Sequence, residues 1–173
     1  LQAAVTALSK LTNGKVHVSV AKNGNSPLTG LSDITLHKVS GPHPSGNVGT
    51  QINKIDPINK GEVVWTINAQ DLVIIGELLL TGRFNAERIV ALVGSSVKKP
   101  RYFKTKLGSE IATMVYDNGV DKNGNDRIIS GNVLTGKQVK PDGYLDYYSN
   151  TITVIPEGDD YEFFGWNKPV FNK

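Results

Sequence analysis

A dense group of basic residues near the middle of the chain is the first feature that could do chemistry. It consists of Lys98, Lys99, Arg101, Lys104 and Lys106. Such a group can bind a phosphate, a nucleic acid or an acidic headgroup, but basic residues at a turn are also easily solvated or contact another protein. Elsewhere basic and acidic residues are mostly interleaved, and the formal net charge is only +3. We therefore expect Lys98, Lys99 and Arg101 to contact other proteins of a complex, and we expect no nucleic acid partner.

A turn rich in glycine and proline is the second candidate. It contains Gly41, Pro42, His43, Pro44 and Gly46. Such a rigid, tightly turned segment exposes backbone N–H groups, which can hold an anion or let a partner approach closely. The same composition suits a purely structural connection between two layers, and no GxGxxG or GKS signature points to a nucleotide. We favour the structural connection and keep the turn as a candidate ligand or partner site.

Other residue types exclude several kinds of chemistry. The chain has no cysteine, so it can form no disulfide, thiolate nucleophile or Cys-ligated metal centre of its own. The histidines His17, His37 and His43 lack HxxxH or HExxH spacing, and we expect no metal site at them. The carboxylates Asp71 and Glu77 fall on different faces of their expected helix, so they form no acid and base pair. We predict no catalytic residue.

The first half of the chain has the pattern of an α/β domain. Apolar spacing predicts helices over residues 2–11 and 68–82, and alternation predicts strands over residues 16–20 and 34–39. We expect Leu72, Ile75 and Leu79 to form the buried face of the second helix, which Asn68 or Thr66 caps and Gly82 ends. The histidine at position 17 should point away from the buried valines of its strand. This order of elements suggests the closing part of an α/β domain.

The stretch 87–115 predicts a strand, a tight turn, a second strand and a short helix. Its strands should cover residues 89–93 and 102–105, with two further strands over 127–134 and 151–155 completing a small sheet. Gly108 or Ser109 should begin the helix, and Leu107 and Ile111 should be buried between helix and sheet. This is the opening of a β-grasp, in which a sheet folds around one helix.

The ends of the chain and its apolar runs limit its relation to membranes. The longest apolar run, residues 72–80, is far shorter than the ~20 residues that a membrane span needs. The first residues lack the basic region and the apolar core of a signal peptide, and we expect an internal piece of a longer protein. The tail, residues 157–173, carries Phe163, Phe164 and Trp166, which we expect to form a contact with other proteins together with the basic turn.

Several segments together resemble the A subunits of the Na⁺-translocating NADH:quinone reductases. In order, they are LTNGKVHV, GPHPSGNVGT, VVWTINAQDLVIIGELLLTGR, RIVALVGSSVKKPR, RIISGNVLTG and FGW. The resemblance extends over residues 8–169 and implies an α+β chain. It implies the end of a Rossmann-like α/β domain over residues 1–85, and a soluble-ligand-binding β-grasp (SLBB) domain, ubiquitin-like in fold, over residues 86–156. The aromatic tail, residues 157–173, would lead toward a further C-terminal region.

The resemblance also implies a function. The family member is a peripheral component on the cytoplasmic side of the bacterial inner membrane, in a respiratory complex that couples electron transfer to sodium export. The implied partners are the other subunits of that complex and quinone, although no motif locates a quinone site. The glycine-rich flavin and nucleotide loop of the related complex I subunit is absent from this sequence, and no cysteine cluster follows. We therefore expect no cofactor in this fragment and no catalysis by it alone.

Two other classes stay open at this stage. One is a free-standing β-grasp module that binds a small ligand, and the other is an SLBB module of the polysaccharide-export type, neither with a redox role. The export type should carry a signal peptide and a lipobox, which the sequence does not show. The uncut gene and its neighbours would distinguish these classes.

The lack of cofactor motifs gives a first prediction. The purified chain should be colourless, because no loop that could hold a flavin is found in it. An absorption spectrum of the protein, with free flavin as the reference, tests this. A flavin spectrum that stays with the protein through gel filtration would contradict it.

Overall fold

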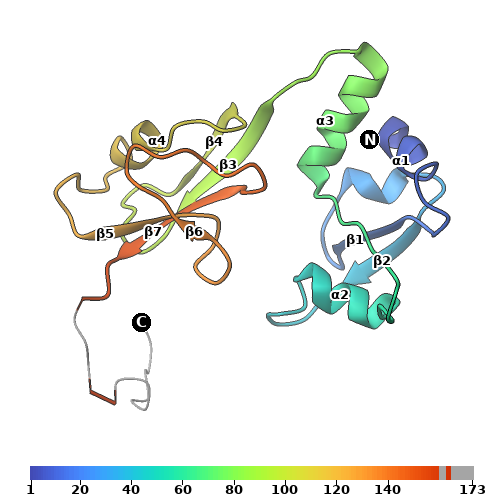
Figure 1. Ribbon diagram of the computed structural model, residues 1–173, viewed down its shortest axis with the longest axis horizontal. Helices are drawn as coiled ribbons and strands as arrows, with labels where there is room; N and C mark the ends of the chain where they lie inside the picture. Colours follow the sequence, from blue (N-terminus) through green and yellow to red (C-terminus); the bar gives the residue numbers. More distant parts are fainter. Residues whose placement is uncertain (160–162, 165–173) are drawn as a thin grey trace. The chain divides into compact units, whose positions relative to one another are not determined.

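The computed structural model describes residues 1–159 and 163–164. The chain divides into two compact units, one over Leu1–Asn85 and one that begins at Ala86 (Figure 1). Each unit has its own cluster of buried apolar side chains. The α+β fold class that the sequence predicts is confirmed.

Unit 1 is a small α/β arrangement around two parallel strands. Its elements are α1 (Gln2–Leu8), β1 (His17–Ala21), the 3₁₀ turn η1 (Pro27–Gly30), β2 (Thr35–Val39), α2 (Val48–Ile55) and α3 (Ala69–Thr81). Helices α1 and α3 lie side by side (Figure 1), and Gly76 of α3 faces Ala4 of α1. The buried core of the unit consists of Ala4, Val5 and Leu72, with partly buried apolar residues around it.

Helix α3 begins and ends where its capping residues predict. The Asn68 side-chain oxygen accepts a hydrogen bond from the Asp71 backbone N–H at 3.0 Å, and Gly82 ends the helix with φ of 69°. Its buried face differs from the expected one, because Leu79 is 54% exposed while Ile74 is buried. Helix α3 carries apolar residues on most of its sides, so the spacing of these residues does not select one face for burial. No described helix is long and apolar enough to cross a membrane.

Helix α2 is an element that the sequence analysis missed. Residues 48–55 form it, directly after the glycine and proline turn, where no helix was predicted. Val48, Ile52 and Ile55 have helical spacing, but none of them is fully buried. Helix α1 is also shorter than expected, since it ends at Leu8.

Unit 2 is a five-stranded β-grasp. Its elements are β3 (Glu87–Val93), β4 (Arg101–Lys106), α4 (Ala112–Tyr116), β5 (Asp126–Ser130), β6 (Lys137–Gln138) and β7 (Thr151–Pro156). The strand order is β4-β3-β7-β5-β6, with β3 and β7 parallel and the other neighbours antiparallel. Ile111, Met114 and Val115 pack against the sheet in the core, as predicted. The predicted β-grasp is therefore confirmed.

Three details of this unit differ from expectation. Strand β5 ends at Ser130, because Gly131 has φ of 102° and the Asn132 side chain accepts hydrogen bonds from the next turn. Ser109 does not cap α4, since its hydroxyl hydrogen-bonds with that of Thr105 at 2.6 Å and closes the preceding turn. Leu107 is only half-buried.

Gly94 fixes the crossing of the β3–β4 turn over strand β7. Its φ is 122°, and a Cβ atom there would lie 2.0 Å from the Val154 carbonyl oxygen. No side chain fits at that distance, so only glycine allows this close approach.

A buried arginine ties the last crossover to the sheet. Arg88 of β3 is 1% exposed, and its Nη1 donates a hydrogen bond to the Tyr147 carbonyl oxygen at 2.6 Å. Its guanidinium also lies over the Tyr147 ring, 5.8 Å from the centroid. In the same segment, the Leu145 N–H donates to the Ser109 carbonyl at 3.0 Å. These bonds hold the crossover that returns the chain to β7.

An ion pair joins the neighbouring ends of β5 and β7. The Arg127 Nε donates to a Glu157 carboxylate oxygen at 3.0 Å, and its Nη2 contacts the other oxygen. The hydrogen bond to Glu157, and then its charge, raise the pKa of Arg127. The hydrogen bond from Arg127 lowers the pKa of the Glu157 carboxyl. Because the pair is at the surface, we expect it to contribute little to stability.

The core of unit 2 gives a stability prediction. Ile111 is fully buried, so Ile111→Ala should lower the free energy of unfolding by about 2–5 kcal/mol. The matched control is Leu107→Ala, which should lower the free energy of unfolding by less, because Leu107 is half-buried. Urea unfolding, followed by NMR at resonances of unit 2, measures both. A loss below about 0.5 kcal/mol for Ile111→Ala would mean that α4 is not the centre of this core.

Candidate functional site

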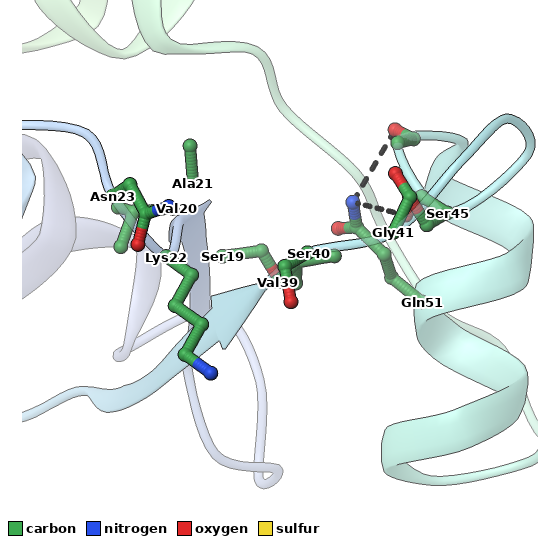
Figure 2. A pocket seen from close by; sticks show the side chains of 11 residues that line it. Ser19, Val20, Ala21, Lys22, Asn23, Val39, Ser40, Gly41, Ser45 and Gln51 are labelled. Carbon is green, nitrogen blue, oxygen red and sulfur yellow. Dashed lines mark hydrogen bonds between the residues drawn. The ribbon is translucent and has the colours of Figure 1, made fainter.

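A groove lies at the carboxyl ends of β1 and β2 in unit 1. It consists of two adjoining hollows of about 410 and 400 Å³, which share the residues Val39, Ser40, Ser45 and Gln51. Figure 2 shows the first of them. Ligands of open α/β sheets bind outside the carboxyl ends of parallel strands. The groove therefore has the position of a ligand site.

The glycine and proline turn forms one wall of the groove. Gly41 has φ of 133°, and the Ser45 hydroxyl donates to the Gly41 carbonyl at 2.8 Å. The Gln51 side-chain amide, from α2, donates to the carbonyls of Ser45 at 3.2 Å and Gly46 at 3.3 Å (Figure 2). Gln51 therefore braces the turn from the helix that follows it.

The structure brings only part of the predicted turn to the groove. Gly41 and Gly46 line it, whereas Pro42, His43 and Pro44 are exposed and are not among the lining residues. The peptide bond between His43 and Pro44 is cis. Whether this turn holds a ligand or a partner stays a prediction.

The charged side chains along the groove are all basic. Lys22 lines the first hollow, and Lys38 and Lys54 line the second, while neither hollow has a lining aspartate or glutamate. Serine and threonine hydroxyls add hydrogen-bonding groups. This composition favours a small anionic or hydrogen-bonding ligand over a cation.

Two histidines meet beside the groove, which the sequence analysis did not foresee. His17 Nδ1 lies 2.9 Å from His37 Nε2, and the two rings meet edge to edge and nearly coplanar, with centroids 5.1 Å apart and planes 16° apart. The parallel register pairs His17 with Thr35 and Ser19 with His37, so both histidines lie on one face of the sheet. His17 is the first residue of β1 and His37 the third residue of β2, so both fall on alternate positions that can share a face. This pattern was visible in the sequence, but it predicts a contact only once the register of the two strands is known.

The predicted basic turn of unit 2 is exposed at its side chains and anchored at its backbone. Lys98 and Lys99 lie in the turn and Arg101 begins β4, and all three are exposed. The Lys99 N–H donates to the Asn118 carbonyl at 3.2 Å, and the Lys98 side chain lies against Gly119.

The other basic and aromatic residues that were considered with this turn do not form one surface with it among the described residues. Lys104 pairs with Glu87 on β3 at 2.8 Å, which separates it from the turn. Trp166 lies outside the described residues. Phe163 is 88% exposed and packs edge to face on Phe164, with ring centroids 4.5 Å apart.

Two family models match the chain in sequence order. The model for the NqrA second alpha/beta domain matches residues 1–84, and the model for the NQRA C-terminal domain matches residues 89–141. The first match coincides with the α/β elements of unit 1, and the second with the greater part of the β-grasp.

Curated relatives named as A subunits of a Na(+)-translocating NADH-quinone reductase agree with these matches. The chain is 44% identical over 167 residues to the relative from Neisseria meningitidis, and the match covers 96% of this chain and 37% of the relative. The relatives from Histophilus somni and Pasteurella multocida are 41% and 39% identical, over 98% and 99% of this chain and 38% of each relative. The chain thus spans less than two fifths of the length of these relatives.

The fold and the matches together define the class of the protein. It is an α/β unit followed by an SLBB-type β-grasp unit, with a groove in the first and an anchored basic turn in the second. The chain belongs to the NqrA family, the A subunits of the Na⁺-translocating NADH-quinone reductase. The predicted resemblance is confirmed.

The bracing of the groove wall gives a prediction. Gln51→Met removes both hydrogen bonds to the turn, so the amide hydrogens of Ser45 and Asn47, which donate to the Pro42 and Pro44 carbonyls, should exchange faster while the melting temperature changes little. Asn53→Met, at an exposed position of the same helix, is the control. Hydrogen exchange measured by NMR makes the comparison. Equal exchange in the two variants would show that Gln51 does not hold the turn.

Proposed function

We propose that this chain contributes to the assembly of a Na⁺-translocating NADH:quinone oxidoreductase complex as part of its peripheral NqrA component. The supporting observation is that both of its units match NqrA domains, in the same order and with similarity to relatives along nearly the whole chain. This observation favours the reductase over a polysaccharide-export module or a free-standing binding module. The proposed location is the cytoplasmic side of the bacterial inner membrane.

The proposed docking surface toward other subunits is the basic turn of Lys98, Lys99 and Arg101. None of the three forms an ion pair within the part of the chain that the structure describes, so their charges are available to a partner. The bonds at Lys99 and the packing at Gly119 fix the backbone beneath them. A surface that is already ordered loses less entropy on binding, which supports a docking role. We include Trp166 of the aromatic tail in the proposed docking surface.

The reaction of the relatives suggests one further ligand. Their name includes quinone reduction, and we propose that the complete NqrA protein interacts with quinone and serves electron transfer coupled to sodium export. This fragment holds no cofactor and no catalytic residue in the proposal, since its groove offers only binding groups. The turn at Gly41 and Gly46 is its candidate ligand contact.

The docking proposal predicts a charge effect on assembly. Replacing Lys98, Lys99 and Arg101 by glutamate in the full-length protein should weaken its association with the membrane subunits. The loss should be largest at low salt, where charge attraction is least screened. Co-purification of the complex, together with sodium-dependent quinone reduction, measures the effect at two ionic strengths.

The control changes the same amount of charge elsewhere on unit 2. Lys122, Lys137 and Lys140 are exposed residues outside the basic turn, and their replacement by glutamate should leave assembly intact. The unfolding midpoints of both triple variants should match that of the parent. Normal assembly and turnover in the Lys98, Lys99 and Arg101 variant would show that the basic turn is a solvated surface and not a docking site.

A further inference from the structure

Half of the six lysines of unit 1 line the groove at the carboxyl ends of β1 and β2. They are Lys22, Lys38 and Lys54. Neither strand contains an aspartate or glutamate, nor does α2, and Asp56 at the end of α2 is not a lining residue. We propose that this groove binds a small organic phosphate. The lysines would hold the phosphate, and apolar residues of the groove would hold the organic part.

The positive charge of the groove has no counter-charge within the described part of the chain. None of the three lysines forms an ion pair there. Their side chains are exposed, so a ligand reaches them from solvent. Lys38 and Lys54 line the same hollow, and because neighbouring like charges repel, a bound anion would relieve that repulsion. The charge of the groove therefore favours an anion.

The donors in the groove favour a phosphate over a carboxylate. A phosphate monoester carries a charge of about −1.5 to −2 at pH 7, more than a carboxylate, and lysine binds phosphate as a point charge. Ser40 lines both hollows, and its hydroxyl makes no hydrogen bond to another described residue, so it can donate to a phosphate oxygen. The Ser45 hydroxyl and the Gln51 amide already donate to carbonyls of the turn (Figure 2).

The groove also offers apolar contacts for an organic part. Val39 lines both hollows, Val20 lines the first, and Leu36 and Ile55 line the second. The hollows, of about 410 and 400 Å³, fall within the range of about 300–1,000 Å³ that is usual for small-ligand sites. Inorganic phosphate would leave the apolar side chains in water. A phosphate ester with an apolar or ring-shaped body would cover them, which favours its binding.

This inference rests on the proposed role of the turn at Gly41 and Gly46 as a ligand contact, and it names the class of that ligand. It does not depend on assembly of the reductase complex, for which the proposed surface is the basic turn of unit 2. The two proposals can therefore fail separately.

The test is a titration of the chain with four probes, followed by the NMR shifts of backbone amides. Phenyl phosphate has a ring and a phosphate, phenol has the ring alone, inorganic phosphate has the charge alone, and benzoate has a ring with a carboxylate. We expect phenyl phosphate to cause saturable shifts at Ser40 and Gly41, and to bind at least threefold more tightly than each other probe. Its affinity should fall as sodium chloride is added, because salt screens the lysine charges.

Lysine variants locate the site. Lys38→Gln and Lys54→Gln should each weaken the binding of phenyl phosphate at least threefold. The matched controls are Lys10→Gln and Lys15→Gln, at exposed lysines of unit 1 outside the groove, and they should leave the affinity unchanged. All four positions are exposed, so the melting temperatures should match that of the parent. Equal affinities in the groove variants and the controls would overturn the proposal.

A neutral short-chain quinone, titrated in the same way, separates this inference from the proposed ligand contact. Shifts of the groove amides with the quinone and none with phenyl phosphate would overturn the anionic class and leave the ligand contact in place. Shifts with none of the probes would overturn both. Binding of phenol or benzoate as tight as that of phenyl phosphate would show that the groove does not select phosphate. Assembly is measured in a separate experiment, so none of these outcomes bears on it.

Discussion

Both units depend on a parallel pairing between strands that are separated along the chain. Parallel strands cannot be joined by a tight hairpin and need a crossover that leaves and re-enters the sheet. In unit 1 the crossover from β1 to β2 passes through η1, and in unit 2 the connection from β3 to β7 contains every other element of the β-grasp. Each pairing therefore decides where distant residues meet.

In unit 1 the parallel pairing creates the site. Because β1 and β2 run in the same direction, their carboxyl ends open at one edge, where Lys22 and the turn after Val39 face a common groove. The same register sets His17 beside His37. In unit 2 the pairing of β3 with β7 requires a long return segment. The buried Arg88 binds that segment at the Tyr147 carbonyl, so an unusual buried charge serves the topology of the sheet.

Local signals predicted much of this fold. Strand β3 is visible in the sequence as an apolar run, as are the Asn68 and Gly82 ends of α3. Which side of β3 is buried is not visible, because Ile89 and Val93 are exposed while Arg88 is buried. The features that could not be predicted depend on tertiary packing. Leu79 has the spacing of a buried residue, but α3 is apolar on several sides and its packing in the core of unit 1, chiefly against α1, selects the buried face. The helical spacing of Val48, Ile52 and Ile55 was present in the sequence, and α2 was missed because these residues follow the glycine and proline turn directly.

The candidate sites follow the same rule: features set by the local sequence could be predicted, and features set by tertiary packing could not. The glycine and proline turn and the basic turn were visible as composition, because turn residues and charge are local properties. Which of their members face a cavity was not visible, since Gly41 and Gly46 line the groove while Pro42 and Pro44 do not. The histidine pair was missed altogether, because it exists only in one register of β1 against β2.

The two turns are built in the same way, although they belong to different units. In each, a neighbouring element makes hydrogen bonds to the backbone: Gln51 of α2 holds the first turn, and the Asn118 carbonyl after α4 holds the second. The side chains that could meet a ligand or a partner are left at the surface. A fixed backbone with exposed functional groups lowers the entropy lost on association, and binding loops on rigid scaffolds commonly have this form.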